Sequence, residues 1–238
     1  MDLYSAMFTR KSVRKFDNLP LDVQAIGGLK SYIADVRPLL KQSKLSYTIL
    51  GAEEVKGMAL PKAPHFLLIS GKEQPLRNTC AGFLFQHAEL YLYAMGYATR
   101  WLAGVKPKRE DPNRIIGLAF GRPAGSAVRR PEDFDRKPMA EIAKGTDSRL
   151  EAVRLAPSGM NGQPWYFVVE GERIQVYYKK SLDGLMGRMY HHTDLDAGIA
   201  LCHLAVASEH EGKPFHFRMD GKPGMAPPKG FEYLGTVE

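Results

Sequence analysis

The sequence contains few cysteines and no long apolar segment. Cys80 and Cys202 are its only two cysteines, too few for a disulfide framework or a cysteine-rich zinc site. No run reaches the roughly 18 consecutive apolar residues that a membrane-spanning helix needs, and the first ten residues lack the basic-then-apolar pattern of a secretory signal. We therefore expect a cytoplasmic protein with free thiols and no membrane partner.

Positive charge exceeds negative charge in this chain. Its 238 residues include 33 Lys and Arg against 26 Asp and Glu, a formal net charge of +7, and 44% are hydrophobic, which is enough for a sizeable core. The densest basic clusters, Arg10–Lys15 and Arg129–Arg130, lack the interleaved aromatic residues of a single-strand nucleic-acid platform. We expect no nucleic-acid partner: the cations either form a solvated surface or bind a small anionic ligand.

Part of the sequence recurs at a nearly constant distance. The pattern Ala-Gly-x4-His-x8-Gly occurs at 81–96 and again at 197–212, and Phe-Asp-x-x-Pro occurs at 16–20 and at 134–138. The matches fall in the same order, which indicates a diverged duplication with halves of roughly 1–128 and 129–238. Two similar halves of one chain are expected to pack about a pseudo-two-fold axis, as the subunits of a homodimer do.

Apolar periodicity and turn residues predict helices and strands in the same order in both halves. Helices are expected over 21–39, 81–95, 149–155 and 195–210, and strands over 65–70, 115–120, 166–170 and 231–234. The segment 81–95 is apolar nearly all round, which is typical of a fully buried helix. Because helices and strands do not strictly alternate, we predict a single α+β domain over 1–238.

The first segment that could carry chemistry is Arg10-Lys-Ser-Val-Arg14. Three cations and a hydroxyl within five residues can bind a phosphate group. If the segment is extended, Arg10, Ser12 and Arg14 lie on one face and Val13 on the other. The alternative is an ordinary exposed basic turn.

The second segment is Leu155–Trp165, which follows a predicted helix and precedes a predicted strand. Its prolines restrict the backbone, and its glycines allow a close approach of the backbone to a ligand. Its Ser, Asn and Gln side chains suit the polar edge of a flat heterocycle. A plain helix-to-strand connection is the alternative. The counterpart at 37–47 has neither glycine nor asparagine, and 129–131 lacks the Arg-x-Ser-x-Arg pattern. We therefore expect one composite site between the halves, whose symmetry mate has decayed.

Together these motifs resemble the nitroreductase family of flavoproteins. Residues 10–16 are similar to the family's R-x-S-x-R-x-[FY] signature, and 155–165 to its A-P-S-x-x-N-x-Q-P-W loop. Weaker similarity extends over 96–104, 118–123 and 136–138. The fusion of two diverged halves resembles the family's TM nitroreductase branch. This resemblance implies a nitroreductase-like three-layer fold, made as a single-chain pseudo-dimer.

The resemblance also implies one non-covalently bound FMN. Residues expected at its phosphate, ribityl chain or N1–C2=O edge are Arg10, Lys11, Ser12, Arg14 and Arg136. Residues expected to line the isoalloxazine ring, its polar edge or the region near N5 are Pro157, Ser158, Gly159, Asn161, Gln163, Leu102, Ala103 and Gly104.

The implied activity is that of an oxidoreductase that uses no catalytic side chain. NAD(P)H would reduce the flavin, and a small flat acceptor such as a nitroaromatic or quinone would then reoxidise it in a ping-pong cycle. The sequence contains no G-x-G-x-x-G motif, so no separate dinucleotide domain is expected. The alternatives are an FMN-binding carrier or sensor without turnover and a flavin-free basic binding module. We expect no metal site, and a monomer or weak homodimer.

Overall fold

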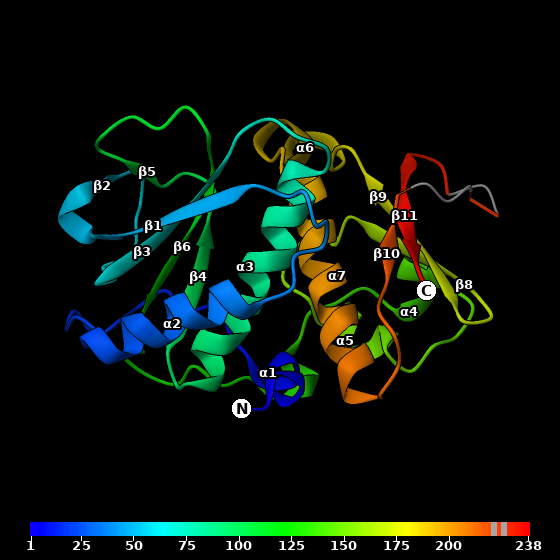
Figure 1. Ribbon diagram of the computed structural model, residues 1–238, viewed down its shortest axis with the longest axis horizontal. Coiled ribbons are helices and arrows are strands. Elements are labelled where there is room, and N and C mark those ends of the chain that lie inside the picture. The colour runs from blue at the N-terminus through cyan, green and yellow to red at the C-terminus, as the bar shows by residue number, and fades with distance from the viewer. Residues whose placement is uncertain (220–222, 225–227) are drawn as a thin grey trace. The chain divides into compact units, whose positions relative to one another are not determined.

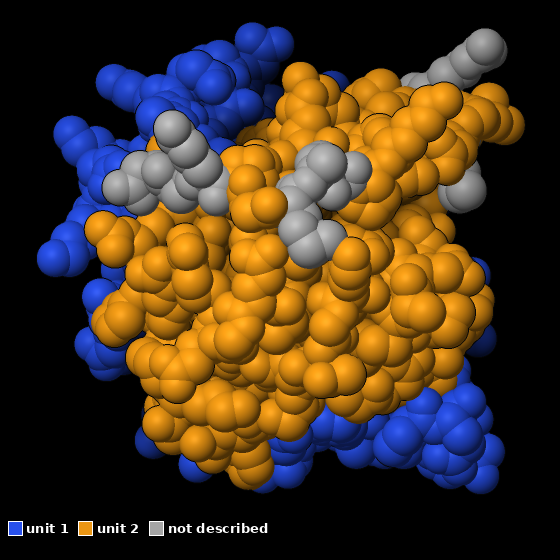
Figure 2. Space-filling view, turned by 90° about the vertical axis from the view of Figure 1, so that its right-hand side faces the viewer, with its two compact units in different colours: residues 1–77, 84–133 blue, residues 78–83, 134–238 orange. Residues whose placement is uncertain are grey.

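The chain folds into two compact units. The structure is a computed structural model that describes residues 1–219, 223–224 and 228–238 (Figure 1). Unit 1 comprises residues 1–77 and 84–133, and unit 2 comprises residues 78–83 and 134–238 (Figure 2). The single domain with halves of 1–128 and 129–238 stays a prediction.

Unit 1 contains a four-stranded antiparallel sheet in the order β1-β3-β6-β4. Its elements are α1 (Leu3–Thr9), α2 (Val23–Asp35), β1 (Leu45–Gly51), η1 (Ala52–Glu54), β2 (Val55–Lys56), β3 (His65–Gly71), α3 (Arg77–Ala94) apart from 78–83, β4 (Ala98–Leu102), β5 (Lys106–Pro107), β6 (Arg114–Gly121) and η2 (Pro131–Asp133). The inner strands β3 and β6 are buried along almost their whole length, so their sequences are continuous apolar runs.

Unit 2 contains a five-stranded sheet in the order β10-β11-β9-β8-β7. Its elements are α4 (Met139–Ile142), β7 (Ala143–Lys144), α5 (Leu150–Arg154), η3 (Gly159–Asn161), β8 (Trp165–Glu170), β9 (Arg173–Lys179), α6 (Gly184–Met189), α7 (Thr193–His210), β10 (Phe217–Arg218) and β11 (Phe231–Val237). His203 of α7 donates from Nδ1 to the carbonyl oxygen of Ala152 in α5 at 2.8 Å, so the two helices are tied together in the core.

The predicted α+β class is confirmed, and all eight predicted elements occur. The helix expected over 21–39 is shorter: it begins at Val23, because Asp22 is its N-cap and accepts from the backbone N–H of Ala25, and it ends at Asp35. Only β7 and β8 form a parallel pair of strands in the described sheets. The sequence analysis missed several elements, among them β1, β4 and β9.

The two long helices have equal lengths and pack through two glycines at equivalent repeat positions. Both α3 and α7 contain 18 residues. Within unit 2, a Cβ on Gly82 would lie 2.0 Å from the carbonyl oxygen of Leu195, and a Cβ on Gly198 would lie 2.0 Å from that of Thr79. The contacts are reciprocal, which agrees with the pattern repeated at 81–96 and 197–212. Only glycine permits such a close approach of two backbones.

We predict that Gly82→Ala and Gly198→Ala each lower the free energy of unfolding by about 1–3 kcal/mol or more, because the added methyl group meets backbone rather than a side chain that can move. Gly27→Ala is the matched control, since nothing lies within 4 Å of a Cβ at this position of α2. The control should stabilise the chain by about 0.5–1 kcal/mol. Urea unfolding of the three variants measures this, and equal effects at all three positions would contradict the prediction.

Candidate functional site

The segment 10–14 of unit 1 is extended and lies beside β4. Isolated bridges join Arg10 to Val128 and Ser12 to Thr99, and the backbone N–H of Val13 donates to the carbonyl oxygen of Thr99 at 3.0 Å. The side chain of Val13 belongs to a buried hydrophobic cluster with Phe16 and others. From the sequence, Val13 was placed on the face opposite Ser12 and Arg14 on the condition that the segment is extended, and the structure meets this condition.

Arg10 does not share the exposed face that we expected for it with Ser12 and Arg14. Its residue is 3% exposed, and its Nε lies 2.9 Å from Oε1 of the buried Glu89 on α3. Lys11, Ser12 and Arg14 are exposed. Burial of a charged side chain requires a partner of opposite charge, so Glu89 explains why Arg10 can point inward.

Further arginines of unit 1 lie close to this segment. Burial and the positive charge of Arg14 lower the pKa of Arg100 on β4. Burial and the charge of Arg10 likewise lower the pKa of Arg129, which Asp133 partly offsets. The backbone N–H of Arg129 also donates to the carbonyl oxygen of Thr9 at 2.8 Å. Positive charge is therefore concentrated around residues 10–14, which suits an anionic ligand.

The predicted N5 segment begins at the end of β4. Leu102 is half-buried and packs against the hydrophobic cluster around Val13. Ala103 and Gly104 are exposed, and the carbonyl oxygen of Ala103 accepts from Nη1 of Arg114 at 3.2 Å. These three residues lie in unit 1, as do Arg10 to Arg14.

The loop between α5 and β8 in unit 2 has a strained backbone. Met160, Asn161 and Gln163 have positive φ values of 52°, 55° and 46°. This left-handed conformation costs free energy for residues other than glycine and persists only where the surroundings hold it. Such strain is concentrated at functional sites, and here it falls within the segment that the sequence singled out.

Side chains of the loop hold one another in place. The backbone N–H of Gln163 donates to Oγ of Ser158 at 2.9 Å, and Nε2 of Gln163 donates to the carbonyl oxygen of Asn161 at 3.1 Å. Oε1 of Gln163, which is 3% exposed, accepts from the backbone N–H of Lys137 at 2.8 Å. Gln163 is therefore turned into unit 2.

Arg136 binds the same loop from the preceding segment. Its Nη1 donates to Oδ1 of Asn161 at 2.8 Å, and its Nη2 donates to the carbonyl oxygen of Leu155 at 3.2 Å. Nδ2 of Asn161 donates to the carbonyl oxygen of Asp135 at 2.9 Å. The structure thus brings together four residues of the predicted site, namely Arg136, Ser158, Asn161 and Gln163.

A buried carboxyl group anchors the start of the loop. Asp196 of α7 is 1% exposed and accepts from the backbone N–H of Gly159 at 3.1 Å and from the Tyr190 hydroxyl at 2.8 Å. A Cβ on Gly159 would lie 2.0 Å from the ring of Tyr190, so no larger residue fits there. Burial raises the pKa of Asp196 to about 8, although the two hydrogen bonds lower it.

A family model described as "Putative TM nitroreductase" matches residues 2–208 of the chain. The chain belongs to this nitroreductase family. The resemblance inferred from the motifs is therefore confirmed, and the family indicates an oxidoreductase. A comparison with curated proteins gave no match.

Of three solved structures that resemble parts or all of this chain, the first shows the same fold. A protein of Thermotoga maritima, described as a "putative nitroreductase", is 19% identical and has a TM-score of 0.71, with 100% of this chain and 93% of that chain covered. An FMN-dependent nitroreductase of Clostridium difficile is 10% identical, with 55% and 93% covered and a TM-score of 0.44. Nitroreductase A of Vibrio parahaemolyticus is 12% identical, with 55% and 71% covered and a TM-score of 0.43.

Glu89, Arg100 and Asp196 were not predicted from the sequence as neighbours of these segments. Glu89 and Asp196 are acidic residues in helices that are otherwise largely apolar. An acidic residue at such a position needs a partner when buried, so both carried a signal. Arg100 had no such signal, because its proximity to Arg14 depends on the pairing of Ser12 with Thr99. The composite site predicted from 10–14 and 155–165 stays a prediction, since these segments belong to different units.

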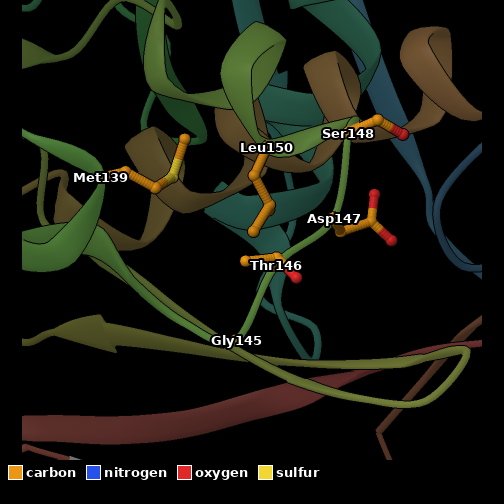
Figure 3. A pocket seen from close by; sticks show the side chains of 6 residues that line it. All are labelled: Met139, Gly145, Thr146, Asp147, Ser148 and Leu150. Atoms are coloured by element: carbon orange, nitrogen blue, oxygen red, sulfur yellow. The ribbon is translucent and has the colours of Figure 1, made fainter.

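Two pockets contain none of the predicted site residues. One, of about 350 Å³ in unit 2, is lined by residues 139, 145–148 and 150 (Figure 3). Its Asp147 forms a buried ion pair with Arg149, with 2.7 Å between Oδ2 and Nη2. The other, of about 450 Å³ in unit 1, includes Ser5, Tyr93 and Val128.

Two kinds of feature are absent from the described part of the chain. No group of three or more His, Cys, Asp or Glu in these ranges is placed to hold a metal ion. Among the same residues, no helix combines the length and the apolar character that crossing a membrane requires.

We predict that the stability of the chain depends on the ionisation of Asp196. Its pKa of about 8 in the folded state exceeds the ordinary value of about 4, so the proton stabilises the folded state fully below pH about 4. This stabilisation is lost as the pH rises toward 8. Relative to Asp196→Asn, the wild-type chain should lose up to about 1.4 kcal/mol of unfolding free energy per pH unit between pH 5 and pH 8.

Asp147→Asn is the matched control in unit 2. Burial raises the pKa of Asp147, but hydrogen bonds from Arg149 lower it more, so its net shift is downward. The difference between wild type and this control should stay constant from pH 5 to pH 8. Urea unfolding at several pH values measures both differences, and a constant difference for Asp196→Asn as well would rule out the assigned ionisation.

Proposed function

We propose that this nitroreductase-family chain is an FMN-dependent oxidoreductase that uses NAD(P)H to reduce small flat acceptors such as nitroaromatics or quinones. The observation that carries the proposal is the strained loop of unit 2. Two of its three residues with positive φ, Asn161 and Gln163, are held by a network of amide and guanidinium groups, at the sequence that resembles the family's flavin-binding loop. A loop held at such a cost is expected to serve a ligand.

The donor set of unit 1 fits the phosphate end of FMN. Lys11, Ser12 and Arg14 are exposed and lie next to each other in an extended segment. The Ser12 hydroxyl and the Lys11 cation can bind a phosphate dianion through charge-assisted hydrogen bonds. Arg14 is proposed at the N1–C2=O edge, where its charge would stabilise the negative charge that develops on reduction.

In unit 2 the proposed contacts come from the exposed side of the loop. Pro157, Ser158 and Gly159 are partly exposed and are proposed to line the ring, while Leu102, Ala103 and Gly104 of unit 1 are proposed near N5. Asn161, Gln163 and Arg136 hold the loop by the contacts described above. Their direct contact with FMN, and that of the buried Arg10, stays a prediction.

When bound, FMN would supply the redox chemistry between NAD(P)H and the acceptor. The chain's own residues bind and orient the cofactor and tune its charge. Because the sequence lacks a G-x-G-x-x-G motif, the donor and the acceptor are proposed to bind in turn at the same place, which gives ping-pong kinetics.

The visible absorption spectrum of the purified full-length chain tests this function. We expect the bands of oxidised flavin, FMN on extraction, bleaching on anaerobic addition of NADH or NADPH, and return of the colour on addition of a quinone. If FMN is bound but is not bleached, the chain would be an FMN-binding carrier or sensor and not an enzyme. If the chain is colourless and takes up no FMN, the remaining interpretation would be a flavin-free basic binding module.

We predict that Arg14→Ala makes the bound flavin harder to reduce, because a cation beside N1 favours the reduced anion. The midpoint potential should fall by on the order of 30 mV, equivalent to about 1.4 kcal/mol for a two-electron couple. Arg109→Ala is the control, since it removes the same charge at an exposed position outside the proposed set. Equal midpoint potentials in the two variants would show that Arg14 does not lie at the N1 edge of the flavin.

A further inference from the structure

A single buried carboxylate connects three elements of unit 1. Glu89 of α3 is 1% exposed. Its Oε1 accepts from Nε of Arg10 at 2.9 Å and from Oγ1 of Thr99 at 2.6 Å, and its Oε2 accepts from Nε2 of Gln86 at 2.8 Å. Both oxygens are therefore engaged, which a buried carboxylate requires.

The network continues to the end of β4 with a fixed direction. Oε1 of Gln86 accepts from the indole Nε1–H of Trp101 at 3.2 Å. Because the carboxylate of Glu89 can only accept, the amide of Gln86 must turn its NH₂ group toward Glu89 and its oxygen toward Trp101. The charge of Glu89 thus determines the orientation of a side chain that binds Trp101, directly before Leu102.

Oε1 of Glu89 binds a residue on each of two paired backbone segments, the N-terminal segment and β4. Arg10 and Thr99 both donate to Oε1, and between them Ser12 pairs with Thr99 and the N–H of Val13 donates to Thr99. This segment pairs with β4, an edge strand of its sheet, through few backbone hydrogen bonds. A charged anchor at a fixed point can set its register.

We propose that Glu89 is a positioning residue that fixes segment 10–14 against β4 and thereby places Lys11 and Ser12 relative to residues 102–104. The consequence for FMN rests on the proposed function, in which these residues bind the cofactor. In this arrangement Arg10 holds the segment through Glu89, so the predicted contact of Arg10 with FMN is replaced by contacts of its exposed neighbours with the phosphate. Were Arg10 itself the phosphate ligand, Glu89 would compete with the phosphate for it.

Glu89→Gln tests the proposal with little change in shape. The variant leaves Arg10 buried without a carboxylate. If the new amide oxygen accepts from Arg10, the new NH₂ group meets that of Gln86 unless the Gln86 amide turns and loses Trp101; if the new amide is turned the other way, its NH₂ group meets the guanidinium of Arg10. The matched control is Asp147→Asn, which removes the carboxylate from the buried Asp147–Arg149 pair of unit 2. Both variants lose a buried ion pair, so both should unfold at lower urea concentration.

The first measurement compares the affinities for FMN and for riboflavin, which lacks the phosphate. We expect Glu89→Gln to weaken FMN binding at least about tenfold, equivalent to 1.4 kcal/mol, and riboflavin binding much less. Asp147→Asn should leave both affinities within about twofold of wild type. If Glu89→Gln lost affinity for FMN and riboflavin equally, or lost none, the proposal would be overturned. Tighter binding of FMN by the variant would also overturn it, because it would show that Arg10 binds the phosphate once Glu89 no longer competes.

The second measurement needs no cofactor and separates the proposal from the proposed function. Hydrogen exchange of the apo chain should be faster in peptides that cover 10–14 and 98–102 in Glu89→Gln than in wild type or Asp147→Asn. Unchanged exchange overturns the positioning role even if the chain binds FMN. Faster exchange supports this role even if wild type binds no FMN, a result that would overturn only the proposed function. Thr99→Val, which removes one donor to Oε1, should give smaller shifts in the same direction if Glu89→Gln does not fold.

Discussion

The ion pair between Arg10 and Glu89 is the interaction on which the arrangement of unit 1 depends. A carboxylate and a guanidinium that are both almost fully buried must be paired, because either one alone would cost several kcal/mol. Since Glu89 belongs to α3 and Arg10 to the N-terminal segment, the pair determines where this segment lies. Lys11, Ser12 and Arg14 are exposed beside β4 as a consequence, and Val13 is buried on the other side.

Unit 2 holds a short loop in an unfavourable backbone conformation. Backbone strain at Met160, Asn161 and Gln163 is offset by side-chain hydrogen bonds within the loop and from Arg136 and Lys137. Asp196 fixes the start of the loop by accepting from the backbone N–H of Gly159, and it also accepts from the Tyr190 hydroxyl. The result is a loop in which Gln163 is buried, while Ser158 and Asn161 are half-buried.

Much of the fold could be predicted from local patterns, whereas the partners of buried polar groups could not. The helix expected over 81–95 was recognisable because it is apolar nearly all round, but it begins earlier, at Arg77, after a Leu76 cap that offers no side-chain signal. The family motifs identified Asn161 and Gln163 without showing that their amides turn inward. Arg10 was expected at the surface because its partner lies 79 residues away, a separation that no spacing rule covers.

The reciprocal contacts of Gly82 and Gly198 link two distant parts of the sequence to each other. A larger residue at either position is blocked by the backbone of the opposite helix, so neither copy of the pattern is free to drift without the other. The segments 37–47 and 154–166 differ in length and composition. The predicted duplication would thus keep its likeness where two backbones touch, whereas of the two connecting segments only 154–166 contains the glycine and asparagine expected of a ligand loop.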